Sequence, residues 1–300
     1  MDAAIEARGL VKRFGDRAAV DGVDLVVPKG AIFGFLGQNG AGKTTTLRLL
    51  LGILEPDGGE RRLLGHARPL EVAHRVGYLP EERGLYPAMT AREAIAYMGA
   101  LRGLPWAEGR KRADALLAAH GLGAHSRARI KTLSKGMAQK VQLLATIVHR
   151  PDLIVLDEPF SGLDPVNQEG LEALIRAERD RGATILFSTH VMAHAERLCD
   201  ALVIVARGRT RFAGTVDEAR RTLPTRVALA TERPLPDPQR VLPPGFRSDG
   251  HGYRFDLPAG GLEPTLRALL DTGSGVRDLH IERPSLHDAF MAIVAETEAA

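Results

Sequence analysis

The sequence has a single cysteine, no long apolar run and almost no excess of charge. Cys199 stands alone among 300 residues, so neither an intramolecular disulfide nor a cysteine-based zinc site can form. No apolar stretch approaches the roughly 20 residues that a membrane-spanning helix needs. The N-terminus lacks the basic and then apolar pattern of a secretion signal. We therefore expect a cytoplasmic chain, for which another protein would provide any membrane channel.

The charge balance excludes another class of protein. The chain has 40 basic and 37 acidic residues, a net charge of +3, which argues against a general nucleic-acid binder, so no nucleic-acid partner is expected. A hydrophobic content of 44% suffices for a normal core. The length is more than one average domain needs, which suggests one large and one small domain.

The apolar pattern predicts an α/β fold. Residues 1 to about 35 alternate short apolar runs with turns, which is typical of antiparallel strands. From about 89 to 149 the pattern is helical, and Thr90 with Glu93 has the spacing of a capping box. Two short apolar runs, 153–156 and 184–187, are typical of buried strands, and a helix over about 166–180 separates them. Together these segments favour a parallel sheet with a helical insert.

The composition changes after about Thr222. Residues 232–246 are rich in proline and predict a linker or loop. The tail then shows a strand, a helix, a strand and a helix in turn. We expect a first domain over residues 1–222 and a separate small α+β domain over 223–300.

A glycine-rich loop carries the strongest functional signal. Gly37 to Thr45 (GQNGAGKTT) fits the pattern G-x-x-x-x-G-K-[ST] and lies between an apolar run and a helical one. In that setting the backbone N–H groups and the helix N-terminus bind phosphates. The residues expected around a nucleoside triphosphate are Gly37, Asn39, Gly40, Ala41, Gly42, Lys43, Thr44 and Thr45. Lys43 would reach the β- and γ-phosphates, and the Thr44 hydroxyl would bind Mg²⁺.

Two adjacent carboxylates complete the expected site. Asp157 and Glu158 follow the buried strand 153–156. Side chains of neighbouring residues point to different sides, so Asp157 can serve the metal while Glu158 orients and deprotonates a water. A purely structural pair of acids is the alternative, and the neighbouring phosphate loop argues against it.

From about Ile5 to Thr215 the chain resembles the ATP-binding subunits of ABC transporters. The resemblance rests on motifs in the family's order: Phe14 at the adenine-stacking position, the phosphate loop, LIVLDEP ending at Pro159, LSKGM over Leu133 to Met137, SGLD over Ser161 to Asp164, and FSTH ending at His190. It implies ATP and Mg²⁺ as ligands and hydrolysis as the activity, with Glu158 as general base and His190 at the γ-phosphate.

The resemblance also implies a partner copy. LSKGM begins a helix for which Ser134 is a good N-cap. In the family this helix end binds the γ-phosphate held by the opposite subunit, so Ser134 and Gly136 would act on a second copy of this chain, or on a homologous ATPase. Asp164 would link the two sites.

Some positions depart from the family's pattern. Glu81 stands where glutamine usually contacts the Mg²⁺ and the attacking water. A carboxylate can still bind the metal, but it adds negative charge near the γ-phosphate, so a slower step and a different coupling both stay open. Gln38 replaces a usual proline, and Lys135 and Met137 depart from LSGGQ. PEERGLYP (residues 80–87), LSKGM and the tail IERPSLHDAFMAIV are similar to bacterial exporter subunits.

The resemblance implies an ATPase subunit that powers export through a separate transmembrane permease, peripheral on the inner face of the cell membrane. The segment 89–149 would dock that permease, which would determine the substrate. The role of the C-terminal domain stays open between dimer contact, regulation and stabilisation.

Three alternative interpretations account for fewer of these residues. A soluble ABC-type ATPase of translation or DNA maintenance usually has two ATP-binding halves or long coiled coils, and this chain has neither. A small-molecule kinase leaves LSKGM and SGLD unexplained. A zinc site on His190 and His194 lacks the glutamate of the H-E-x-x-H pattern, since Val191 stands there.

Overall fold

The structure is a computed structural model that describes residues 2–82, 84–248 and 252–299. Arg83, within the segment 80–87 noted above, lies outside the described residues. The chain divides into two compact units, Met1–Val216 and Asp217–Ala300, so the division lies shortly before the boundary expected after residue 222. In the part of the chain that is described, no helix is both long and apolar enough to cross a membrane.

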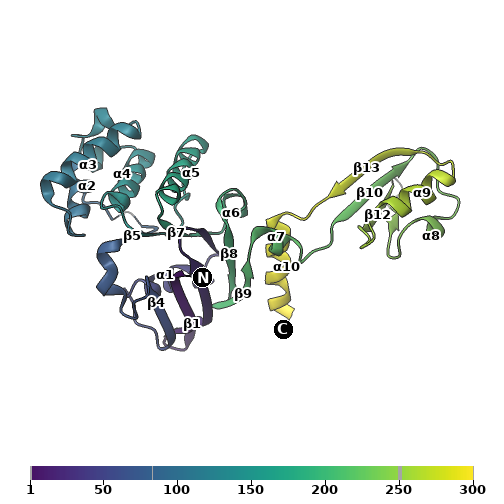
Figure 1. Cartoon of the computed structure of the whole chain (residues 1–300), viewed down its shortest axis with the longest axis horizontal. Coiled ribbons are helices and arrows are strands. Elements are labelled where there is room, and N and C mark those ends of the chain that lie inside the picture. The colour runs from purple at the N-terminus through teal and green to yellow at the C-terminus, as the bar shows by residue number, and fades with distance from the viewer. Residues whose placement is uncertain (1, 83, 249–251, 300) are drawn as a thin grey trace. The chain divides into compact units, whose positions relative to one another are not determined.

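A six-stranded sheet forms the centre of the first unit (Figure 1). Its strands, in spatial order, are β5 (Val76–Leu79), β6 (Leu153–Leu156), β7 (Thr184–Thr189), β3 (Ile32–Leu36), β8 (Ala201–Ala206) and β9 (Arg209–Gly214). All neighbours are parallel except β8 and β9, which pair antiparallel. The carboxyl ends of β3, β6 and β7 therefore meet at one edge, which is where ligands bind in such sheets.

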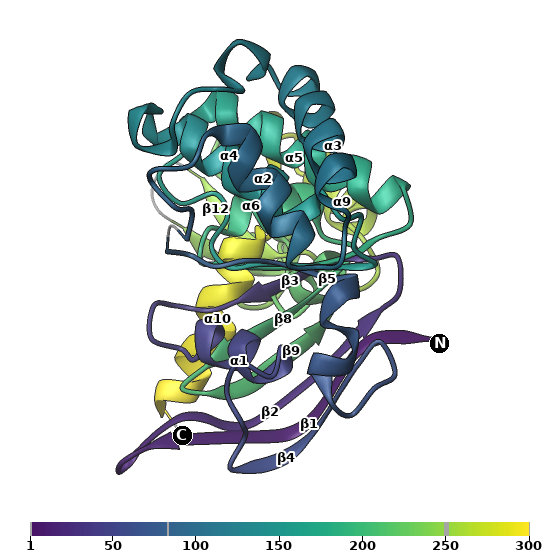
Figure 2. The ribbon, with the colours of Figure 1, turned by 90° about the vertical axis from the view of Figure 1, so that its left-hand side faces the viewer.

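Successive side chains of the parallel strands enter two separate cores. Ile154 and Leu156 pack with α4 (Lys135–Ile147) and α5 (Pro165–Asp180). Val155, on the other face, packs in the cluster that holds α1 (Lys43–Leu50). Figure 2 shows α1 on one side of the sheet and α2, α4 and α5 on the other. Burial on both faces explains why these strands are short continuous apolar runs.

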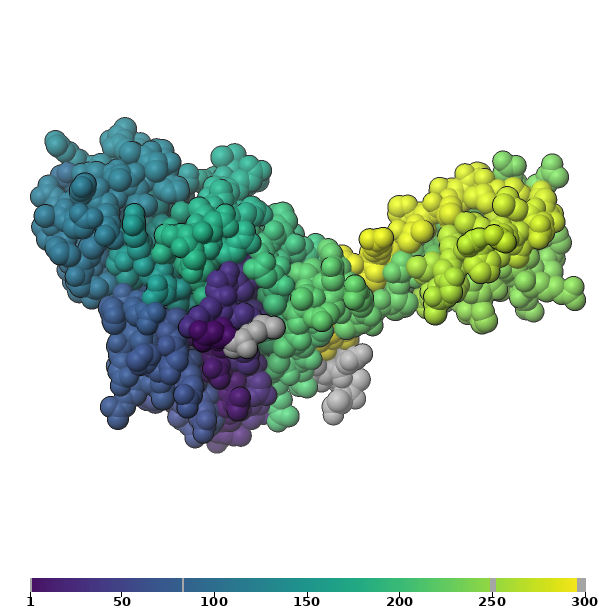
Figure 3. All heavy atoms as spheres, viewed as in Figure 1, coloured from purple at the N-terminus to yellow at the C-terminus, as the bar shows by residue number. Residues whose placement is uncertain are grey.

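An antiparallel sheet packs in the cluster that holds α1 and Val155. Its strands are β2 (Arg17–Pro28), β1 (Ala3–Phe14) and β4 (Gly58–Leu63), in that order. The β1–β2 pair was predicted, whereas β4 was not, because its sequence GGERRL has no apolar alternation. Residues of the N-terminal strands and residues near position 60 lie side by side on the surface of this unit (Figure 3).

The helical insert has the expected start. Thr90 caps α2 (Ala91–Ala100): its Oγ1 accepts from the Glu93 N–H at 3.3 Å, and Glu93 Oε2 accepts from the Thr90 N–H at 3.0 Å. The predicted capping box is therefore confirmed. The remaining helical elements of this unit are α3 (Trp106–Ala119), α6 (Met192–Leu198), and the 3₁₀ turns η1 (Pro69–Arg75), η2 (Gly123–His125) and η3 (Ile130–Thr132).

The second unit contains a four-stranded antiparallel sheet. Its strand order is β11 (Arg247–Ser248), β12 (Tyr253–Asp256), β10 (Arg226–Thr231) and β13 (Val276–Glu282). Val227, Phe255 and Leu269 form part of its core, which joins α9 (Glu263–Asp271) to the sheet. The other helices are α7 (Val216–Arg220), α8 (Pro238–Val241), which lies in the segment expected to be a loop, and α10 (Leu286–Ala299).

His149 couples the stability of the first unit to pH. Its Nε2 lies 3.2 Å from the carbonyl oxygen of Val76, and its Nδ1 is buried with no hydrogen-bond partner among the described residues. Burial lowers the pKa of His149 to about 4. An unfolded histidine has a pKa near 6.5, so between about pH 6.5 and pH 4 only the unfolded chain takes up this proton.

We therefore predict that the free energy of unfolding falls as the pH is lowered from 6.5 to 4.5, and that His149→Gln removes part of this fall. After discounting for the partial exposure of the ring, we expect that part to be about 2 kcal/mol. Urea titrations at the two pH values measure it, with the exposed His125→Gln as control. Identical pH dependence in wild type and His149→Gln would contradict the assignment.

Candidate active site

The glycine loop joins β3 to α1 and requires glycine for steric reasons. Gly40 and Gly42 have φ of 81° and 99°, in the left-handed region that side chains disfavour. A Cβ on Gly42 would also overlap the carbonyl oxygen of Ala19. Because α1 begins directly at Lys43, its free N–H groups face the site.

The ammonium of Lys43 folds back over this loop. Its Nζ donates to the carbonyl oxygens of Gly37 at 2.8 Å and Gln38 at 3.3 Å, and it lies 3.1 Å from Glu158 Oε1. The side chain is only 6% exposed, so these oxygens replace most of its water. The buried charge is thereby compensated.

Glu158 occupies the centre of the site in a strained conformation. Its φ is 48°, which is uncommon for a residue other than glycine and costs about 1–3 kcal/mol. One carboxylate oxygen faces Lys43, and the other lies 2.9 Å from Nδ1 of His190. The carboxylate therefore lies between an ammonium and an imidazole, where it can accept a proton from a water in the same space.

Ser188 connects the two acids and was not among the residues predicted for the site. Its hydroxyl donates to Asp157 Oδ1 at 2.6 Å and accepts from the backbone N–H of Glu158 at 2.9 Å. Its position in the sequence could have indicated a role in the site, because Ser188 lies at the end of β7, two residues before His190. Asp157 is 1% exposed, and its Oδ2 has no hydrogen-bond partner in the described part of the chain. A buried carboxylate oxygen without a partner is suited to a cation or to water held by a cation.

A cleft of about 660 Å³ lies over these groups, within the size range of ligand pockets. Its lining residues are Phe14, Arg17, Ala19, Asn39, Gly40, Gly42, Lys43, Thr44, Thr45, Glu81, Glu158, Ser161 and His190. Ten of these were predicted, whereas Arg17, Ala19 and Ser161 were not. Phe14 and Arg17 are paired across the β1–β2 turn, and the Phe14 ring is 53% exposed.

Not all predicted residues line this cleft. Gly37 and Ala41 contribute backbone atoms to the hydrogen bonds of the loop. The carbonyl oxygen of Gly37 accepts from Lys43 Nζ, and the Ala41 N–H donates to the carbonyl oxygen of Gln38. Asp157 lines an adjoining cavity of about 450 Å³ that shares Glu81, Glu158 and Ser161 with the cleft.

Ser134, Gly136 and Asp164 line neither space. Ser134 caps α4, as predicted, by accepting from the Met137 N–H at 3.3 Å. Asp164 caps α5 and accepts from the backbone and side chain of Asn167, and these bonds lower the pKa of its carboxyl group. A Cβ on Gly136 would lie 3.1 Å from Nδ2 of Asn167, so the start of α4 and the start of α5 lie side by side.

His190 and His194 have different partners. The His194 ring stacks on Phe160 with centroids 3.9 Å apart, and its Nδ1 lies 3.4 Å from Glu172 Oε1. Burial lowers the pKa of His194, which favours its neutral form. His194 thus packs in the first unit while His190 faces the cleft.

The sequence profile of the ABC transporter family matches residues 20–161. The chain is 36% identical over 286 residues to the uncharacterized ABC transporter ATP-binding protein YhaQ of Bacillus subtilis (strain 168), covering 94% of this chain and 95% of that protein. The chain belongs to the ABC transporter ATP-binding proteins. It is also 35% identical over 304 residues to the daunorubicin/doxorubicin resistance ATP-binding protein DrrA of Streptomyces peucetius, covering 97% and 92% of the two chains.

A solved structure agrees with this membership. The ATP binding subunit of an ABC transporter superposes with a TM-score of 0.68 at 34% identity, covering 73% of this chain and 92% of that one. The predicted family and its phosphate-loop fold are therefore confirmed. The relatives support the interpretation as an ABC transporter subunit, and they give no support to a role in translation or DNA maintenance.

Ser188 provides a test of the geometry. We predict that Ser188→Ala lowers kcat for ATP about tenfold or more. The change removes the hydroxyl that donates to Asp157 Oδ1 and accepts from the Glu158 N–H, so neither acid is held in place by it. Steady-state phosphate release measures kcat, and a denaturant titration shows whether the variant is folded. A folded variant with wild-type kcat would show that this serine does not position the acids.

Proposed function

We propose that this chain hydrolyses ATP between two copies placed head to tail and thereby powers export through a separate membrane permease. The observation that carries the proposal is the position of Glu158, held between Lys43 and His190 beside the phosphate loop. One cleft thus combines Glu158 as catalytic base, Lys43 as the cation for the phosphates and the His190 ring for the γ-phosphate.

ATP would bind along the cleft. The N–H groups of the glycine loop and the N-terminus of α1 would hold its phosphates. Lys43 would exchange its contacts with Gly37 and Glu158 for phosphate oxygens, and this exchange frees Glu158. The exposed ring of Phe14 would stack on the adenine.

The residues present fit a magnesium ion. Thr44 lines the cleft, Glu81 lines both the cleft and the adjoining cavity, and Asp157 Oδ2 is a buried oxygen without a partner among the described residues. Hydroxyl and carboxylate oxygens are the donors that Mg²⁺ prefers. When bound, the ion would offset the negative charge of the phosphates.

Hydrolysis would proceed by attack of a water on the γ-phosphorus. Glu158 would accept the proton of the water as its oxygen bonds to phosphorus. The bond from the γ-phosphorus to the bridging oxygen would break, leaving ADP and inorganic phosphate. His190 would hold the γ-phosphate and keep Glu158 oriented.

A second copy would complete the site. Ser134, Gly136 and Asp164 lie at helix starts outside their own chain's cleft, which supports their use on a partner's nucleotide. Free N–H groups at the start of α4 are suited to a phosphate presented from outside. A homologous ATPase could replace the second copy.

The permease would dock on the helical segment 89–149, with the loop around Glu81 relaying the nucleotide state. This arrangement would put the chain at the inner face of the cell membrane. The full-length similarity to a drug-resistance ATP-binding protein supports export as the direction of transport.

We predict that Glu158→Gln retains ATP binding but lowers turnover by at least about a hundredfold, because an amide cannot accept the proton. The variant should accumulate as an ATP-bound dimer, which gel filtration with multi-angle light scattering detects. Glu60→Gln, an exposed change on β4, is the matched control. Near-normal hydrolysis by Glu158→Gln would rule out the general-base role.

Purification from native membranes tests the transport part separately. After gentle solubilisation, we predict that the tagged chain co-purifies with a protein of several membrane spans in a fixed ratio. Recovery only with ribosomes or nucleic acid would contradict transport and would leave the ATPase chemistry intact.

A further inference from the structure

The cavity that adjoins the nucleotide cleft has an unusual charge content. Among the residues that the structure describes, four carboxylates line it, those of Glu81, Glu82, Asp157 and Glu158, and Lys135 supplies the one ammonium. Lys43 neutralises Glu158 from the cleft side, at 3.1 Å. Of the described residues that line the cavity, Lys135 is therefore the one that offers a positive charge to the remaining three carboxylates.

The ammonium of Lys135 lies over the 161–162 turn. A Cβ on Gly162 would stand 2.8 Å from Lys135 Nζ, and Ser161 in the same turn lines both the cavity and the nucleotide cleft. In the described part of the chain, this ammonium forms no hydrogen bond and no ion pair, so its charge acts on the cavity as a whole.

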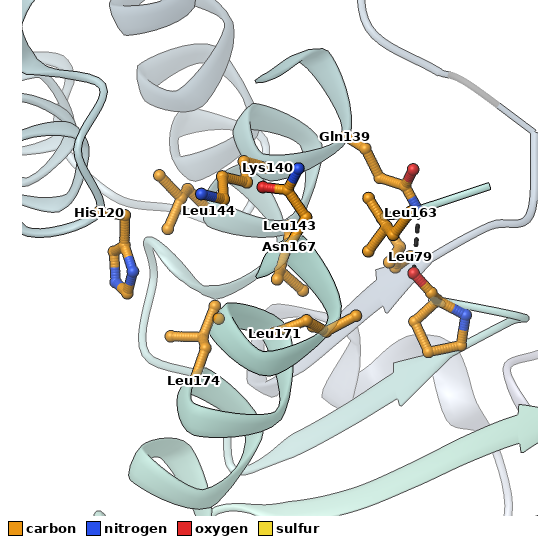
Figure 4. Close-up of a pocket in the computed structure, with 12 residues that line it drawn as sticks. Leu79, His120, Gln139, Lys140, Leu143, Leu144, Leu163, Asn167, Leu171 and Leu174 are labelled. Atoms are coloured by element: carbon orange, nitrogen blue, oxygen red, sulfur yellow. Dashed lines mark hydrogen bonds between the residues drawn. The ribbon is translucent and has the colours of Figure 1, made fainter. Parts of the chain in front are cut away.

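Two glutamines of α4 fix Lys135's helix to the cavity wall. Gln139 Nε2 donates to the carbonyl oxygen of Pro159 at 2.8 Å, a bond that Figure 4 shows as a dashed line. Gln142 Nε2 donates to the carbonyl oxygen of Glu82 at 3.2 Å. These bonds hold α4 against the segments that carry Asp157 and Glu81, so the separation between Lys135 and the carboxylates is set by the fold.

We propose that Lys135 is a positioning residue that acts within its own chain as the counter-charge to Glu81. Glu81 reaches both the cavity and the cleft, so its negative charge acts on the same space as the phosphates of the nucleotide. An ammonium in the adjoining cavity lowers the repulsion between that carboxylate and ATP. This inference rests on the proposed function of the site as an ATPase.

A double-mutant cycle separates this role from a structural one. At low ionic strength, where such charges are least screened, we expect Lys135→Met to lower kcat/KM for ATP about fivefold in the wild-type background. In the Glu81→Gln background the same change should cost less than about twofold, because the charge to be offset is gone. Lys135→Arg, which retains the charge, should remain close to wild type, and the fivefold effect should shrink in high salt.

Lys140→Met is the matched control. Lys140 lies on the same helix but faces a separate apolar pocket between α4 and α5 (Figure 4), so it should show no dependence on Glu81. Equal costs of Lys135→Met in both backgrounds would overturn the proposal and indicate that Lys135 acts elsewhere, for example on the partner's nucleotide. A wild-type kcat/KM for Lys135→Met would also overturn the proposal. The same holds if Lys135→Arg loses as much kcat/KM as Lys135→Met does. If the wild-type protein itself fails to hydrolyse ATP, the proposed function has failed, which is a different result.

Discussion

The carboxylate of Glu158 has to stand between an ammonium and an imidazole, and much of the site is arranged to keep it there. Its backbone is in the left-handed region, which costs free energy that the surroundings must offset. The N–H of Glu158 bonds to Ser188, and its oxygens face Lys43 and His190. Those three residues come from α1 and from the end of β7, so the order of the parallel strands is what brings them together.

The same interaction connects binding with chemistry. In the structure, the ammonium of Lys43 contacts Glu158 and two loop carbonyl oxygens. In the proposed function, phosphates would compete for that ammonium, so occupation of the loop would release Glu158 to act as the base. Asp157 is tied to this arrangement through Ser188 and keeps one oxygen available. The charges of Lys43 and Glu158 are therefore balanced locally, which a buried site requires.

Motif spacing predicted most of the cleft, while segments with little apolar pattern escaped prediction. Buried strands with continuous apolar runs directly precede the phosphate loop, the two acids Asp157 and Glu158, and His190. Strand β4 was missed because its charged sequence carries no period of two, and it is held by pairing with β1. Ser188 and Arg17 were missed because their roles come from neighbours distant in sequence. Ser188 bridges two acids that follow another strand, and a Cβ on Gly40 would lie 3.8 Å from Nη2 of Arg17.

Hydrolysis of each nucleotide at a site shared by two copies is tested most directly by mixing two inactive variants. These are Lys43→Ala, with a defective phosphate loop, and Ser134→Arg, with a defective α4 start. If the sites are shared, each mixed dimer has one intact site, and the mixture should recover up to about a quarter of wild-type ATPase activity. No recovery on mixing, with both variants folded and able to dimerise, would contradict the account.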